Sequence, residues 1–123
     1  MDGKDTEKQN GSSETVDPEE ARKLLGSNEA TAIDIRDDEL WREGRLPGAR
    51  HCPDGDVGEA LEQIDEDQKV IVACEDGEES ARVAEQIREK GRDAVVLAGG
   101  MEAWRSDDQP MQPSRDPDED AKV

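Results

Sequence analysis

The chain has 123 residues, enough for about one domain. It contains 34 acidic and 16 basic residues, which gives a net charge of −18 at pH 7, and its mean hydropathy is −1.06. This charge repels nucleic acid and anionic membrane surfaces, so neither is expected as a partner. No apolar run approaches the ~18 residues of a membrane-spanning helix, so no span is expected.

Apolar residues are concentrated in the middle of the chain, and the two ends are polar. Residues 1–13 show no periodicity, and residues 106–123 combine prolines with acids, so both are predicted to be flexible tails around one domain at 14–105. The polar N-terminus lacks the apolar region of a signal peptide, which predicts a cytoplasmic protein. The two cysteines are therefore expected to be free thiols.

The composition resembles that of proteins from extreme halophiles. Acidic residues outnumber basic ones about twofold, Arg outnumbers Lys, and Phe and Tyr are absent. The alternative is an ordinary acidic protein that works in dilute salt. In both cases the acidic surface would repel an anionic substrate over about one Debye length, ~8 Å at physiological salt.

The first half of the domain alternates strands with helices. After a minimal strand at 14–16, Asp17 is placed as the N-cap of a helix whose first position is Pro18 and which ends at Gly26. The pattern then predicts an apolar strand, a helical turn and a short second strand, at 30–36, 38–44 and 48–52.

The second half continues the alternation. Apolar residues at helical spacing predict a helix over 57–64, and the run at 69–74 is apolar without alternation, as in a strand covered on both faces. A helix at 79–92, a strand at 93–100 and a helical turn at 101–105 follow. This order predicts an α/β fold with a mainly parallel sheet flanked by helices, whose chemistry gathers at the carboxyl ends of the strands.

Cys74 lies at such an end, in the turn between the buried strand and the next helix. Backbone N–H groups and the helix dipole stabilise an anion in such a turn, and Gly77 allows the loop to close around it. Carboxylates beside the thiol oppose its ionisation and are expected to select what approaches. The alternative is an inert buried thiol. The amides expected to hold the sulfur belong to Glu75, Asp76, Gly77, Glu78, Glu79 and Ser80.

Over residues 14–105 the chain resembles the rhodanese, or sulfurtransferase, family. One part of the resemblance is the segment "AIDIRDDELWREGRLPGARHCP", in which an Asp-x-Arg at a strand end leads to a Gly-x-x-Pro-Gly-Ala turn. The other part is "VIVACEDGEESARVAEQIREKGRDAVVLAGGMEAW", with a Cys-x-x-Gly-x-x-Ser loop, a helix, a strand and a Gly-Gly pair before Trp104. The matching positions of the first segment are Asp34, Arg36, Gly44, Arg45, Leu46, Pro47, Gly48 and Ala49.

The resemblance implies a five-stranded sheet and a single-domain sulfurtransferase without a cofactor. In this reading Cys74 cycles between thiol and persulfide within a loop at 74–79. Sulfur comes from thiosulfate or a persulfide, which a partner protein can carry, and passes to an acceptor such as cyanide or a thiol. One cysteine suffices because both steps are displacements at sulfur. The alternative is a non-catalytic member of the family that binds a partner or senses oxidants.

The loop departs from the family pattern in its charge. Many family loops carry Arg where this chain has Glu79, and here no residue of 74–80 is basic. This departure weakens the expectation of thiosulfate as donor. Arg82 is expected to pair with Glu79 across one helical turn. The sixth residue after Cys74 is Ser80 and not the Arg that clamps phosphate in a related fold, which argues against a phosphatase or arsenate reductase.

The other notable side chains are expected to be structural. Asp34 and Arg36 are predicted to tie the carboxyl edge of the sheet together, with Arg36 as a second source of positive potential near the loop. Cys52 is expected to fill space, with a relay thiol as the alternative. His51 has no partners at metal-ligand spacing, so no metal site is expected. Packing roles are expected for Trp41 and Trp104.

Overall fold

Five parallel strands form the centre of the molecule in the computed structural model, which describes residues 14–53 and 57–112. The order across the sheet is β1-β5-β4-β2-β3, and each of the strand pairs is parallel. The strands are β1 (Thr15–Val16), β2 (Ala30–Asp34), β3 (Arg50–His51), β4 (Lys69–Ala73) and β5 (Ala94–Leu97).

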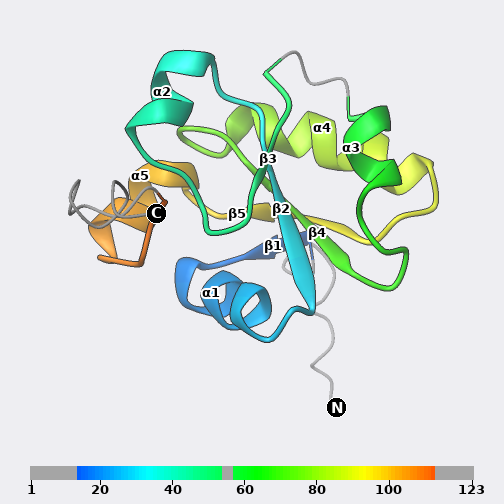
Figure 1. Ribbon diagram of the computed structural model, residues 1–123, viewed down its shortest axis with the longest axis horizontal. Helices are drawn as coiled ribbons and strands as arrows, with labels where there is room; N and C mark the ends of the chain where they lie inside the picture. The colour runs from blue at the N-terminus through cyan, green and yellow to red at the C-terminus, as the bar shows by residue number, and fades with distance from the viewer. Residues whose placement is uncertain (1–13, 54–56, 113–123) are drawn as a thin grey trace, which may run out of the picture.

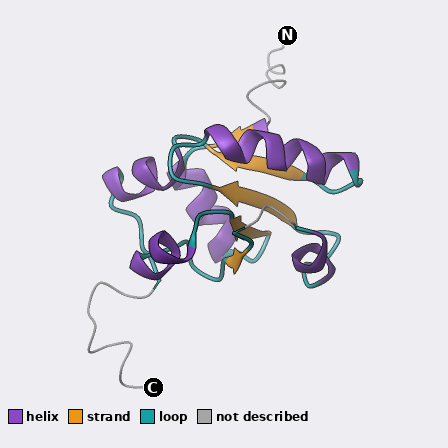
Figure 2. Cartoon of the chain, turned by 90° about the horizontal axis from the view of Figure 1, so that it is seen from above, coloured by secondary structure: helices purple, strands orange, loops and turns teal. Residues whose placement is uncertain are grey.

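Helices cover both faces of this sheet, so the domain has three layers (Figures 1 and 2). Residues of α3 and α4 share one apolar cluster with Ile33 and Val72 of the sheet, and residues of α1 and α5 share another with Ile71. The predicted α/β fold with flanking helices is confirmed. The helices are α1 (Pro18–Gly26), α2 (Asp38–Glu43), α3 (Gly58–Glu62), α4 (Glu78–Glu89) and α5 (Gly100–Ser106).

The helix boundaries follow local capping chemistry. Asp17 caps α1, since its side chain accepts a hydrogen bond of 2.8 Å from the amide of Glu20, as predicted. The strand predicted over 93–100 is shorter, because Gly99 and Gly100 take positive φ values of 73° and 63° and turn the chain into α5. The sequence therefore located these elements and misjudged some of their ends.

The chain stays in contact with the domain beyond the boundary predicted at 105. The Trp104 indole Nε1 donates to the carbonyl of Pro110 at 2.9 Å, and Gln112 forms an antiparallel bridge with Arg45. A fully buried indole N–H requires an acceptor, and the returning chain supplies it. Two tails are predicted, at 1–13 and 106–123, and the described part of the second, 106–112, contacts the domain; residues 1–13 and 113–123 lie outside the described residues.

The strand register brings several segments of the chain together at one edge of the sheet. Asp34 of β2 stands in register with both Ala73 of β4 and His51 of β3, so the residues that follow these three strands meet at one edge of the sheet.

In the part of the chain that the structure describes, no helix has the length and apolar character needed to cross a bilayer.

Candidate active site

Cys74 directly follows β4 and lies at the carboxyl edge of the sheet with only 5% of its surface exposed. The amide of Gly77 donates to its Sγ at 3.1 Å, and the hydroxyl of Ser80 lies 3.3 Å from Sγ. The Ser80 side chain is fully buried and also donates to the carbonyl of Gly77 at 3.2 Å. The Gly77 amide therefore donates to the sulfur, whereas the Ser80 hydroxyl accepts from the thiol and can donate to a sulfur anion after it rotates away from the Gly77 carbonyl.

Gly77 is the residue that turns the loop into α4. Its φ of 95° lies in the left-handed region, and a Cβ there would come within 3.3 Å of the Gly99 amide nitrogen. The amide of Glu78 donates to Asp76 Oδ1 at 3.0 Å. Of the amides predicted to surround the sulfur, that of Gly77 makes the described contact with Sγ, and that of Glu78 is directed to a side chain.

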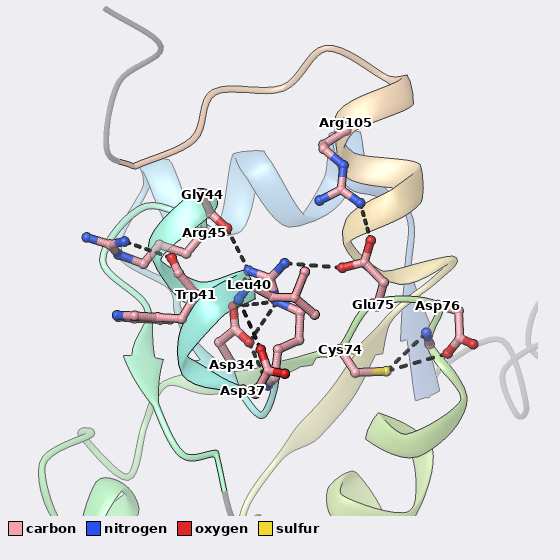
Figure 3. A network of polar contacts seen from close by, with 12 residues as sticks. Asp34, Asp37, Leu40, Trp41, Gly44, Arg45, Cys74, Glu75, Asp76 and Arg105 are labelled. Carbon is pink, nitrogen blue, oxygen red and sulfur yellow. Dashed lines mark hydrogen bonds and ion pairs between the residues drawn. The ribbon is translucent and has the colours of Figure 1, made fainter. Parts of the chain in front are cut away.

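The four loop acids do not all face the thiol. Glu75 turns away from it and accepts hydrogen bonds from Arg36, at 3.2 Å, and from Arg105 of α5 (Figure 3). Asp76 Oδ1 lies 3.9 Å from Cys74 Sγ. Glu79 is exposed and forms the expected ion pair with Arg82, at 3.6 Å. Glu75 is thus held between two guanidinium groups that offset its charge.

The Arg36 side chain bonds to β2, to the end of α2 and to the Cys74 loop. Its guanidinium donates to both oxygens of Asp34, at 2.9–3.2 Å, and to the carbonyl of Gly44 at 2.6 Å. Burial opposes the charge, but the hydrogen bonds and charges of Asp34 and Glu75 outweigh it, so the pKa of Arg36 is raised. Asp34 and Arg36 therefore tie the carboxyl edge together.

The N-terminus of α5 packs against the backbone of the loop. The amides of Met101 and Glu102 donate to the carbonyls of Cys74 and Glu75, at 2.9 and 3.0 Å. A Cβ on Gly100 would lie 2.5 Å from each of those carbonyl oxygens. Neither this contact nor the role of Arg105 is predicted from the sequence. The Gly-Gly pair in front of a helix was the available signal, because glycine allows such close backbone approach.

A pocket of about 420 Å³ opens in front of the thiol. One wall comes from the segment after β2 and from α2, and the other from the Cys74 loop. Cys74 is thus buried by its surroundings yet borders a space that can hold a small molecule. The described residues that line the pocket are Ile35, Arg36, Asp37, Leu40, Pro53, Cys74, Glu75, Asp76 and Glu79.

Cys52 and His51 lie beside a second cavity, of about 380 Å³. The Cys52 amide bonds to the carbonyl of Asp34 on β2, and β2 separates β3 from β4. Because neighbouring strands are ~4.8 Å apart, the two cysteines are separated by roughly 10 Å, too far for a disulfide without backbone movement. His51 stacks on Trp41 at 4.4 Å, while Trp104 is fully buried.

Comparison with known proteins places this arrangement in a family. The Rhodanese-like domain model matches residues 17–107. Thiosulfate sulfurtransferase GlpE of Pseudomonas aeruginosa (strain LESB58) is 35% identical over 92 residues, which cover 74% of this chain and 83% of that protein. GlpE of Glaesserella parasuis serovar 5 is 31% identical over 98 residues, with 79% and 91% covered.

A solved structure agrees with these relatives. The crystal structure of a rhodanese-like domain protein from Staphylococcus aureus has a TM-score of 0.65 and 29% identity, and the match covers 74% of this chain and 90% of that one. The residues that the family model matches, 17–107, include strands β2 to β5, the Cys74 loop and every residue that lines the pocket in front of the thiol. The chain belongs to the rhodanese-like domain family.

Proposed function

We propose that the protein is a sulfurtransferase that carries sulfane sulfur as a persulfide on Cys74. The observation that supports this most directly is that the Cys74 thiol borders a pocket while the Gly77 amide donates to its sulfur at 3.1 Å. The relatives named thiosulfate sulfurtransferase support the same class of reaction. The proposed donor is thiosulfate or a persulfide, and the proposed acceptor is a thiol or cyanide.

The reaction consists of two displacements at sulfur. The Cys74 thiolate attacks the outer sulfur of the donor, the donor's bond to that sulfur breaks, and the leaving group departs with the electron pair. The acceptor then attacks the outer sulfur of the Cys74 persulfide and releases the thiolate. The Gly77 amide, which donates to Sγ, would stabilise the Cys74 thiolate, and the Ser80 hydroxyl would do the same once it rotates from the Gly77 carbonyl towards the ionised sulfur.

The variant Cys74→Ser tests this proposal. We expect the wild-type protein to gain one sulfur atom from a polysulfide and to lose it to cyanide, as measured by intact mass. Cys74→Ser should gain none while its circular dichroism spectrum and Tm stay close to wild type, because the exchange of sulfur for oxygen changes little volume.

Cys52→Ser serves as the matched control, since Cys52 lies two strands from the loop. It should load as the wild type does. Sulfur that persists on Cys74→Ser would contradict a single carrier thiol. A wild-type thiol that reacts with a neutral alkylating agent but accepts sulfur from no donor would favour the non-catalytic, partner-binding alternative.

A further inference from the structure

The pocket in front of Cys74 has an unequal distribution of charge. Among the described residues that line it, one side chain is positive and four are negative, so its formal charge is +1 − 4 = −3. Within the loop itself, no residue from 74 to 80 is basic. Among the described lining residues, the Arg36 guanidinium is therefore the one side-chain charge that could attract an anion into this pocket.

Arg36 is not available for that purpose. Its side chain is 2% exposed, and its guanidinium is hydrogen-bonded to the Asp34 carboxylate and to the carbonyl of Gly44. It also faces Glu75 at 3.2 Å, so two carboxylates already offset its single charge. To bind a substrate anion, Arg36 would have to break buried ion pairs, which is costly because it leaves a carboxylate without its partner.

Three carboxylates therefore set the sign of the potential at the thiol. Asp37 and Asp76 accept hydrogen bonds from backbone amides of Leu40 and Glu78, and no described ion pair offsets them in the pocket. The ion pair described for Glu79 is the solvated contact with Arg82, in which both side chains are more than 60% exposed. Oδ1 of Asp76 lies 3.9 Å from Sγ.

The same pocket has an apolar side, formed by Ile35, Leu40 and Pro53. This wall suits the carbon chain of an organic sulfur compound better than the hydrated oxygens of an inorganic anion. Carboxylates beside an apolar wall favour a ligand that combines a short carbon chain with an ammonium or guanidinium group.

We infer that the sulfur donor of this site is an organic persulfide that carries a positive charge close to its sulfur. This inference rests on the proposed function of Cys74. Two sources share the chemistry, namely a small aminothiol persulfide and a persulfidated cysteine that is flanked by Lys or Arg in another protein. The Cys74 thiolate attacks the outer sulfur of R–S–SH, the donor S–S bond breaks, Cys74–S–SH forms, and R–S⁻ leaves with the electron pair.

A series of small persulfides that differ in charge tests the inference. The persulfides of cysteamine, 2-mercaptoethanol and mercaptoacetate carry a positive, a neutral and a negative group at similar length. Their rates of sulfur transfer to Cys74 are measured by intact mass, and each is divided by the rate of the same donor with a small neutral thiol. We expect the cationic donor to exceed the anionic one by about tenfold or more at low salt.

Added salt and variants that remove a negative charge test whether the pocket carboxylates cause the preference for a cationic donor. At 1 M KCl, where the Debye length is about 3 Å, the preference should shrink. It should also shrink in Asp76→Asn and in Glu79→Gln. Glu89→Gln removes an exposed charge further along α4 and should leave the preference unchanged. An anionic donor as fast as the cationic one, or a preference that these pocket variants leave intact, would overturn the inference.

Two peptide persulfides, Lys-Cys-Lys and Glu-Cys-Glu, distinguish the sources of the charge. A Lys-flanked peptide that loads Cys74 faster than cysteamine persulfide supports a protein donor, and the reverse order supports a small aminothiol. Equal rates for the two peptides count against a charge requirement. Equal loading by all donors would overturn this inference alone, whereas no loading of an accessible Cys74 by any donor would overturn the proposed function with it.

Discussion

At the scale of single residues, substitution of Ser80 can test how much a side chain, as opposed to the backbone amides, stabilises a sulfur anion on Cys74. Its hydroxyl is fully buried, lies 3.3 Å from Cys74 Sγ and can rotate to donate to a sulfur anion. The sequence predicts that the backbone amide of Ser80 lies near the sulfur, and the structure shows that its side-chain hydroxyl lies there. A hydrogen bond to a charged group stabilises it by roughly 1.5–3 kcal/mol.

Ser80→Ala should therefore slow the loading of Cys74 by about tenfold or more, with a smaller effect on stability, because the hydroxyl acts on the charged states of sulfur. The measurement is the rate of sulfur gain by intact mass, together with the Tm. Ser106→Ala, an exposed change at the end of α5, is the control and should load as the wild type does. An unchanged rate in Ser80→Ala would assign the stabilisation of the anion to the Gly77 amide alone.

At the scale of elements, the loop and α5 behave as one unit. Two amides at the start of α5 donate to the loop carbonyls of Cys74 and Glu75, and Arg105 near its end pairs with the Glu75 side chain. Gly100 lies where these segments approach most closely. The position of the thiol therefore depends on a helix that begins 26 residues after it.

Gly100→Ala should displace this contact. Its Cβ would lie 2.5 Å from two carbonyl oxygens at a φ of 63°, so we expect a loss of about 2 kcal/mol or more in the free energy of unfolding and slower loading of Cys74. The measurements are urea unfolding and intact mass.

Gly26→Ala is the matched control for this change. Nothing lies within 4 Å of a Cβ at that position, which is the last residue of α1. It should change stability by about 1 kcal/mol or less and leave loading intact. Equal effects of the two substitutions would mean that the close approach of α5 to the loop is unimportant.

The sequence predicts the elements better than it predicts the contacts between them. The alternation of apolar strands with helices indicated the sheet, and the strand-to-helix turn identified Cys74. The ion pair between Glu75 and Arg105 could not be predicted, because Arg105 is distant in sequence and its position depends on how α5 packs. The same holds for Gln112, whose bridge to Arg45 continues the domain into a segment that reads as an acidic tail.

At the scale of the whole molecule, the net charge of −18 is the dominant feature. Exposed ion pairs such as Lys69–Asp93 and Arg82–Glu79 contribute little each. The excess of carboxylates repels itself across the surface and favours expansion of the chain. We propose that this surface is suited to concentrated salt, as the composition suggests.

This proposal predicts that salt stabilises the fold. Between about 0.01 M and 1 M KCl the Debye length falls from about 30 Å to about 3 Å, so repulsion between carboxylates should be largely screened. We expect the Tm to rise by roughly 5–10 °C, which corresponds to about 1–2 kcal/mol. Thermal unfolding followed by circular dichroism measures this change.

The same titration close to the isoelectric point, pH 4.3, is the control. With little net charge left to screen, the effect of KCl should be much smaller there. A Tm that falls as KCl is added at pH 7 would show that attractive ion pairs outweigh the repulsion.

The contact between the loop and α5 also has a consequence for protein synthesis. Among the described strands β1 comes first in the chain and pairs with β5, which comes last, and the carbonyls of the Cys74 loop accept hydrogen bonds from the helix that follows β5. During synthesis the segments of a chain leave the ribosome in order from the N-terminus. While Cys74 has left the ribosome and α5 has not, the nascent chain lacks both of these contacts. The Cys74 loop therefore reaches its final surroundings only after α5 has left the ribosome, so an interrupted chain would carry this loop without its hydrogen bonds from α5.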